Sequence, residues 1–207
     1  MIGIIDYQGG NLNNVKRAFE FFGFNVEIIN EPVSLKSLNG LVLPGVGAFS
    51  YAMSQLKEKG FVNFIRDFVE SGKPFMGICL GIQLLFEKSY EFEKSDGLGI
   101  IKGDVVKFKK VSKIPHIGWN QVFFKKDSKF LKGTVKNSDF FYFVHSYYVV
   151  PEDNEVILTT TLYENEEFVS SIEKDNIFAC QFHPEKSQEN GLKIIKAFGE
   201  FCVNTSN

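Results

Sequence analysis

Short apolar runs alternate with helical patterns through the first half of the chain. Runs such as Ile2–Ile5 and Phe75–Ile78 contain no charged residue, which is typical of parallel strands buried on both faces. The alternation predicts strands over 2–5, 26–29, 41–43 and 75–78, and helices over 12–22, 61–69 and 81–88. It favours an α/β fold, with a mainly parallel central sheet flanked by helices.

The pattern changes after about residue 100, where short apolar segments follow one another with turn residues between them. They predict strands over 104–108, 121–124, 140–150, 156–161 and 168–172, then a buried strand over 178–181 and a closing helix over 192–202. Strands in succession without helices are typical of antiparallel pairing. Because no linker or repeat interrupts the sequence, we expect residues 1–207 to form a single domain, with an antiparallel region in its second half.

Composition and charge exclude several classes of protein. The formal charge is −2, and the basic residues are spread out, which argues against a nucleic-acid or membrane surface as the main partner. No apolar run approaches the roughly 18 residues of a membrane span, and the start lacks the basic region of a signal peptide. The scattered cysteines Cys79, Cys180 and Cys202 argue against a disulfide framework or a metal site. We therefore expect a cytoplasmic protein.

The segment Gly77-Ile78-Cys79-Leu80-Gly81 has the form of a strand-to-helix elbow that exposes a nucleophile. A thiol attacks carbonyl groups mainly as the thiolate, which a helix N-terminus and a neighbouring imidazolium favour. The backbone N–H of Leu80 would then face a developing oxyanion. A cysteine simply buried in an apolar strand is the alternative, and this segment alone does not decide between the two.

The segment Gln181-Phe182-His183-Pro184-Glu185 offers a base for that nucleophile. His183 follows an apolar strand, and Glu185 stands two residues later, so both side chains can emerge at one edge of the sheet. A carboxylate beside an imidazole fixes its tautomer and orientation. Together with Cys79, these two residues predict a Cys–His–Glu hydrolase, provided that the fold brings the two segments into contact.

A third segment, Pro44-Gly45-Val46-Gly47, ends the predicted strand over 41–43. Glycines on both sides of a small apolar residue allow unusual backbone angles and leave N–H groups bare. From spacing alone an ordinary tight turn is the better reading. The functional alternative is a second oxyanion donor facing Leu80, of a kind worth about 2.7–4 kcal/mol of transition-state stabilisation.

With these segments in this order, the chain resembles the class I (triad) glutamine amidotransferases, a family with a flavodoxin-like α/β fold. Within that family it is most similar to the glutaminase subunits of imidazole glycerol phosphate synthase, from histidine biosynthesis. The elbow and the His-Pro-Glu segment are common to the wider family. The segments 43–49, 115–120 and 142–148 are specific to these glutaminases, and the similarity runs nearly end to end.

The resemblance implies covalent thioester chemistry without a metal or cofactor. In it, Cys79 attacks the carboxamide of L-glutamine and releases ammonia, His183 transfers the proton, and Glu185 orients the imidazole. The residues implied in glutamine binding or in the oxyanion site are Gly45, Val46, Gly47, Leu80, Gln83, Ser146 and Tyr147. In this family the Val46 peptide is expected to need reorientation before its N–H points inward, which keeps the glutaminase nearly idle without its partner.

The implied partner is a (β/α)₈-barrel cyclase subunit, which receives the ammonia within a heterodimer. Trp119, Tyr142 and Lys186 resemble residues that face this barrel, although alone they would be read as two core aromatic residues and a solvated lysine. One departure loosens the partner assignment, because Gln8 replaces a glycine of the family's first loop. The alternative is a related glutaminase that supplies a sugar amidotransferase in surface-polysaccharide synthesis through a cyclase-like barrel.

Two alternative functions, from other classes of protein, stay open from the sequence alone. A free-standing cysteine peptidase or amidase on the same elbow needs an open groove and is active without a partner. A regulatory or scaffold subunit that has lost the chemistry has no need of Cys79, His183 and Glu185 together. His116 and His145 lack a carboxylate placed like Glu185, so we expect structural or interface roles for them.

Overall fold

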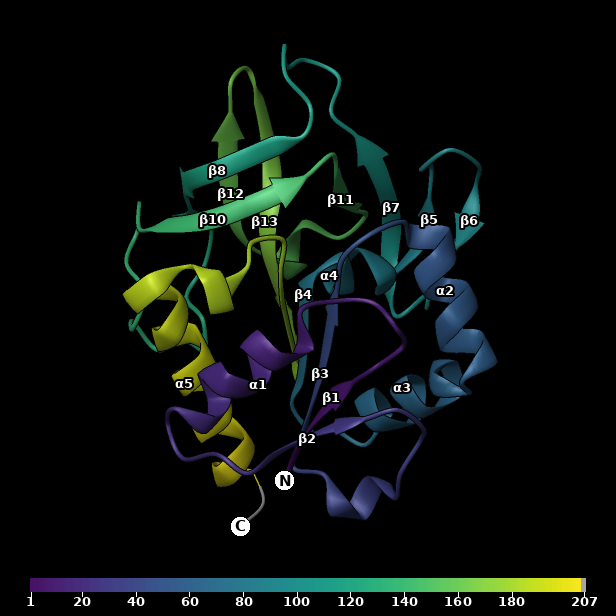
Figure 1. Cartoon of the computed structure of the whole chain (residues 1–207). Helices are drawn as coiled ribbons and strands as arrows, with labels where there is room; N and C mark the ends of the chain where they lie inside the picture. The colour runs from purple at the N-terminus through teal and green to yellow at the C-terminus, as the bar shows by residue number, and fades with distance from the viewer. Residues whose placement is uncertain (206–207) are drawn as a thin grey trace.

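The computed structural model describes residues 1–205 (Figure 1). The strands are β1 (Ile2–Ile5), β2 (Val26–Ile29), β3 (Gly40–Gly45), β4 (Phe75–Cys79), β5 (Phe86–Ser89), β6 (Ser95–Asp96), β7 (Ile101–Lys107), β8 (His116–Gln121), β9 (Phe123–Phe124), β10 (Phe140–His145), β11 (Tyr147–Pro151), β12 (Ile157–Tyr163), β13 (Glu166–Lys174) and β14 (Ile177–Cys180). The α-helices are α1 (Leu12–Glu20), α2 (Phe49–Glu58), α3 (Phe61–Glu70), α4 (Leu80–Leu84) and α5 (Gln188–Asn204), and the short 3₁₀ turns are η1 (Leu35–Ser37), η2 (Asn154–Val156) and η3 (Pro184–Lys186).

Parallel strands form the centre of the main sheet, in the order β2-β1-β3-β4-β14. Their side chains alternate between two apolar layers, as the pleat of a strand requires. In β3, Leu41 and Leu43 pack on the face covered by α2 and α3, whereas Val42 packs on the face covered by α1 and α5. Figure 1 shows these two helix pairs on opposite sides of the strands. The predicted α/β fold with a mainly parallel sheet is confirmed.

The antiparallel region predicted for the second half is also present. β13 pairs antiparallel with β14 and continues the main sheet through β11 and β7. β8 and β10 form a separate antiparallel pair, which crosses beyond the carboxyl ends of the parallel strands (Figure 1). Among residues 1–205, none of the helices is long and apolar enough to cross a membrane.

Two element predictions are wrong. The helix predicted over 81–88 ends at Leu84, because Phe86 to Ser89 instead form β5, which pairs with β7. The strand predicted over 140–150 breaks at Ser146 into β10 and β11, which belong to different sheets. In both places pairing with other strands overrides the local sequence pattern.

The sequence pattern missed two elements that surround the site described below. Helix α2 begins at Phe49, directly after the glycine-rich end of β3, and was not predicted. Strand β8 covers His116–Gln121 and was not predicted, whereas the strand predicted over 121–124 corresponds to the end of β8 and to β9 (Phe123–Phe124). Gly118 interrupts the apolar alternation of β8, which explains why that strand was missed.

Candidate active site

Cys79 lies at the elbow between β4 and α4, at the carboxyl edge of the parallel sheet. Its backbone angles, φ 55° and ψ −107°, are unusual for a residue with a side chain and mark a sharp turn. The turn needs glycine at its end, since a β-carbon on Gly81 would lie 1.9 Å from the carbonyl oxygen of Leu43. The predicted elbow is therefore present. Leu80, the first residue of α4, has an N–H without an acceptor inside the helix.

His183 and Glu185 form a buried pair directly after β14. The Nδ1–H of His183 donates to Oε1 of Glu185 over 2.8 Å, and the two side chains are 2% and 1% exposed. Because a carboxylate only accepts, this bond places the proton on Nδ1 and leaves Nε2 as the basic nitrogen. Nε2 is buried and has no hydrogen-bond partner of ordinary geometry, and neither has Oε2 of Glu185.

The imidazole of His183 is electrostatically coupled to Cys79. Burial alone lowers the pKa of His183, but the charge and hydrogen-bonding capacity of the Cys79 sulfur, together with the Glu185 carboxylate, raise it well above its ordinary value. The sulfur thus lies near enough to interact with the ring, although Nε2 does not make a well-formed hydrogen bond to it. The structure brings the two segments together as expected. A raised pKa favours the imidazolium that forms when the ring takes up a proton.

The chain segment that carries His183 is fastened to β10. The N–H of His183 donates to the carbonyl oxygen of Tyr142 over 2.9 Å. The Ser187 hydroxyl accepts from the N–H of Tyr142 over 2.9 Å and donates to the carbonyl oxygen of His183 over 2.6 Å. These three bonds, two of them made by the Ser187 hydroxyl, fix the imidazole relative to the two-stranded sheet.

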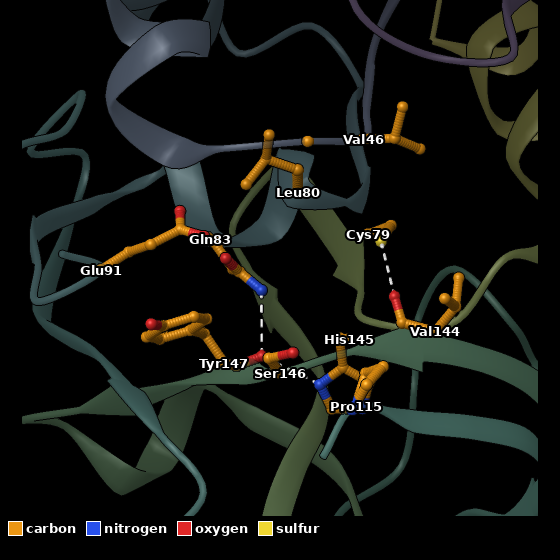
Figure 2. Close-up of a pocket in the computed structure, with 11 residues that line it drawn as sticks. Val46, Cys79, Leu80, Gln83, Glu91, Pro115, Val144, His145, Ser146 and Tyr147 are labelled. Carbon is orange, nitrogen blue, oxygen red and sulfur yellow. Dashed lines mark hydrogen bonds between the residues drawn. The ribbon is translucent and has the colours of Figure 1, made fainter.

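A cavity of about 300 Å³ opens onto the sulfur (Figure 2). Among the residues predicted for substrate binding or the oxyanion site, those that line it are Val46, Gly47, Leu80, Gln83, Ser146 and Tyr147. Gly45 lies just behind them, buried and paired with Cys79 in the β3–β4 register. The Val46 side chain is 44% exposed at the mouth of the cavity. The fold therefore gathers three separate predicted segments around the nucleophile.

Glu91 also lines the cavity and was not predicted. It follows β5 in the turn to β6, and one of its carboxylate oxygens accepts from the N–H of Phe49 over 2.6 Å. No spacing in the sequence distinguishes it from other surface acids, because its position depends on the missed helix α2. Its charge complements an ammonium group on a ligand.

Of two further histidines, His145 lines the cavity and His116 lies behind it. Nδ1–H of His145 donates to the carbonyl oxygen of Tyr147 over 2.9 Å, so its Nε2 accepts from Nδ1–H of His116 over 3.0 Å. Nε2 of His116 in turn lies 3.3 Å from the amide nitrogen of Asn120. Burial lowers the pKa of His116 to about 4 and that of His145 to about 3. Both rings are thus neutral, which agrees with the structural role expected for them.

The residues predicted to face a partner lie outside the cavity. Trp119 and Tyr142 sit opposite each other on β8 and β10, with ring centroids 6.2 Å apart, and Trp119 is 46% exposed. Lys186 is exposed on η3, next to this pair of strands. Within residues 1–205, no group of three or more potential ligands is arranged to hold a metal ion.

Comparison with known proteins agrees with this geometry. Residues 3–200 match the family model "Glutamine amidotransferase class-I". The chain is 56% identical to "Imidazole glycerol phosphate synthase subunit HisH" of Aquifex aeolicus, over 94% of each chain. It is 52% identical to the protein of the same name from Caldanaerobacter subterraneus, over 97% of this chain and 98% of that one.

Solved structures share the fold at low sequence identity. The PurLQS structure from Thermotoga maritima superposes with a TM-score of 0.76 and 20% identity, covering 100% of this chain and 98% of that chain. A glutamine amidotransferase crystal structure gives a TM-score of 0.75 at 18% identity, over 98% of each chain. With the family model and the close relatives, the conclusion is direct: the chain belongs to the class I glutamine amidotransferase family.

Proposed function

We propose that this amidotransferase is the glutaminase subunit of an imidazole glycerol phosphate synthase, in histidine biosynthesis. The observation that carries the proposal is the buried His183–Glu185 pair beside Cys79, with the sulfur opening onto a cavity that holds one carboxylate. The relatives at 52–56% identity all bear the name of that synthase subunit, so the sugar-amidation alternative is not favoured.

The chemistry follows from the positions of three side chains. The Cys79 sulfur attacks the carboxamide carbon of glutamine while its proton passes to Nε2 of His183. The tetrahedral intermediate collapses when the imidazolium gives that proton to the leaving nitrogen, so the C–N bond breaks and ammonia departs. Water, activated by the same nitrogen, then hydrolyses the thioester to glutamate. Glu185 holds the ring and stabilises its charged form throughout.

Two backbone N–H groups stabilise the oxyanion. The Leu80 amide at the start of α4 is one, since it has no helical acceptor and the helix dipole reinforces it. The Val46 amide is the other, once its peptide turns toward the cavity. Gly47 follows with φ 95°, a conformation that leaves this short segment freer to reorient.

The same cavity recognises the amino-acid end of glutamine. Glu91 pairs with the α-ammonium group, because it is the one carboxylate on the cavity wall among residues 1–205. Gln83 accepts a hydrogen bond through Oε1, since its nitrogen already donates to protein oxygens. Ser146 and Tyr147 offer backbone groups, and Gly47 leaves room for the substrate.

The ammonia passes to a partner subunit, a HisF-type (β/α)₈ barrel with cyclase activity, in a heterodimer. Trp119, Tyr142 and Lys186 contact that partner. Their position supports this, because β8 and β10 expose apolar side chains immediately beside the cavity. We propose that the single domain of residues 1–207 acts in the cytoplasm and needs no cofactor.

The test is Cys79→Ala in the complex with the partner subunit. We expect loss of glutamine-dependent synthesis and full retention of ammonia-dependent synthesis, both measured with saturating acceptor. Cys202→Ala, a buried cysteine on α5 away from the cavity, is the matched control and keeps both activities. Loss of both activities in Cys79→Ala would mean that the cysteine supports assembly rather than chemistry.

A further inference from the structure

Gln181 is a fully buried polar residue at the end of β14, two residues before His183. It does not line the cavity, and the proposed chemistry leaves it without a role. Its Nε2 donates to the Cys79 sulfur over 3.8 Å, and its Oε1 accepts from Nε2 of Gln83 over 3.0 Å. The buried amide therefore joins the nucleophile to the helix that follows it.

The surrounding bonds fix which way this amide points. Nε2 of Gln83 also donates to the carbonyl oxygen of Tyr147 over 3.0 Å, a bond drawn in Figure 2. A carbonyl oxygen only accepts, so the Gln83 nitrogen is the donor on both sides. It follows that Gln181 turns its oxygen toward Gln83 and its N–H₂ group toward the sulfur.

The sulfur of Cys79 thus lies between an acceptor and a donor. The carbonyl oxygen of Val144 is 3.9 Å away and attracts the thiol hydrogen (Figure 2), whereas Gln181 offers an N–H at 3.8 Å. When the thiol proton moves to Nε2 of His183, the carbonyl interaction is lost and the N–H interaction strengthens. Because Cys79 is 6% exposed, little water can replace that donor.

We infer that Gln181 stabilises the Cys79 thiolate and holds the sulfur in place for attack. The inference rests on the proposed glutaminase chemistry, in which the thiolate is the attacking species. Formation of the thiolate needs no further reactant, since the proton of the Cys79 thiol goes to His183. Gln83 acts behind Gln181, by fixing the orientation of its amide.

The test is the rate of Cys79 alkylation by iodoacetamide between pH 5 and pH 10, followed peptide by peptide with mass spectrometry. Gln181→Glu keeps the oxygen that accepts from Gln83 but replaces the donor by an acceptor. We expect the pH midpoint of alkylation to rise by about one to two units, the equivalent of a lost hydrogen bond to a charged atom. Gln181→Met removes the donor without adding charge, and a smaller rise in the same direction is expected.

Glutamine hydrolysis in the complex gives a second measurement. We expect Gln181→Glu to lower kcat by about 10- to 100-fold, with little change in KM, because Gln83 keeps its partner. Gln55→Glu, on α2, adds the same charge away from the cavity and is the control. An unchanged alkylation midpoint in a folded Gln181→Glu protein overturns the inference. If Gln181→Glu does not fold, an unchanged midpoint in Gln181→Met overturns it instead.

The two proposals fail in distinguishable ways. If the wild-type complex hydrolyses no glutamine, the proposed function fails, while the alkylation profile still reports on Gln181. If the wild-type complex is active and Gln181→Glu matches it in both measurements, the function stands and the inference about Gln181 is wrong.

Discussion

The three histidines of this chain differ in charge because their neighbours differ. His183 faces a carboxylate and a sulfur, so its charged form is favoured. His116 and His145 face each other, aromatic rings and a carbonyl oxygen, without an acid, so burial favours their neutral forms. One residue type thus has a raised pKa in one place and a lowered pKa in the other.

We predict that no histidine of the folded protein titrates near pH 6.5, the ordinary histidine pKa. The pKa of His116 is lowered to about 4 and that of His145 to about 3, whereas the Cys79 sulfur and the Glu185 carboxylate raise the pKa of His183 well above 6.5. NMR spectra of the histidine rings recorded from pH 4.5 to pH 8 measure this directly. An inflection near pH 6.5 for either member of the His116–His145 pair would contradict the neutral-pair assignment.

The same shifts make folding stability depend on pH. Below pH 6.5 the unfolded chain takes up protons at His116 and His145 that the folded protein refuses, so the stability contributed by these two rings is complete above pH 6.5 and falls as pH drops toward 4. The raised pKa of His183 acts in the opposite direction: its contribution is present below pH 6.5 and is lost as pH rises through its folded pKa. We expect a loss of about 2 kcal/mol per imidazole between pH 6.5 and pH 5, measured by denaturant titration.

Glu185 offers a separate test at the same scale. Glu185→Gln keeps the shape of the side chain but removes the charge that stabilises the imidazolium. We expect kcat for glutamine hydrolysis to fall by about 10²- to 10⁴-fold, with ammonia-dependent synthesis unchanged. Glu189→Gln, at an exposed acid on the first turn of α5, is the matched control. A kcat within twofold of wild type would remove Glu185 from the mechanism.

Residues with a local signature were predictable, and residues placed by tertiary contacts were not. Cys79 stands between glycines, and Glu185 stands two positions after His183, so short spacing indicates both. Glu91 reaches the cavity through its bond to Phe49, 42 positions away in the sequence. Gln181 was part of a predicted segment, but its contact with Cys79 depends on the pairing of β14 with β4.

At the scale of elements, the elbow depends on how closely α4 approaches β3. A β-carbon on Gly81 meets a backbone atom rather than a flexible side chain, so α4 itself would have to shift. That shift would displace the Leu80 amide and the sulfur together. The positions of the Cys79 sulfur and of the Leu80 amide, which we propose as nucleophile and oxyanion donor, therefore depend on one helix–strand contact.

Gly81→Ala tests this contact. We expect a loss of about 1–3 kcal/mol in folding stability and a fall in kcat, both caused by displacement of α4. Gly72→Ala is the control: Gly72 has φ 77° with open space around it, so alanine there costs only backbone strain, about 1–2 kcal/mol, with normal kcat. Stability is measured by denaturant titration and kcat in the complex. Equal kcat values for the two variants would show that the elbow tolerates the shift.

The predictions of strands were correct where the local apolar pattern agrees with how the strands pair in the sheet. The strands over 2–5 and 75–78 are buried on both faces and lie in the parallel centre of the sheet, as continuous apolar runs indicate. Residues 86–89, Phe-Glu-Lys-Ser, lie at the end of the predicted helix but pair with β7, and only that pairing makes them a strand. A single run likewise cannot reveal that Ser146 divides two sheets.

Across the whole molecule, one pair of strands joins the cavity to an exposed apolar surface. The outer side of β8 and β10 carries Ile117, Trp119 and Phe140, which are 56%, 46% and 48% exposed. The same strands bring Val144 and His145 to the cavity wall. A partner that binds the outer side therefore contacts the elements that shape the site.

This arrangement predicts that the partner controls the glutaminase rate. We expect the isolated chain to hydrolyse glutamine far more slowly than the complex with acceptor bound, because we propose that the Val46 peptide turns inward only in the complex. Trp119→Ala removes the largest exposed aromatic side chain of this surface, so the affinity for the partner should fall by about 30-fold or more. The stimulation of the rate and the affinity for the partner are both measured by adding increasing amounts of partner and following the rate of glutamine hydrolysis.

The form of that titration separates binding from chemistry. If Trp119 contributes only to affinity for the partner, excess partner restores the full stimulated rate to Trp119→Ala. The rate of the isolated chain then does not change. Phe21→Ala, at a side chain 73% exposed after α1, removes similar apolar area elsewhere and should leave the titration unaltered. A Trp119→Ala rate that stays low at saturating partner would place the tryptophan in the activating step itself, because β8 would then transmit the contact inward through the Asn120–His116–His145 bonds to Tyr147.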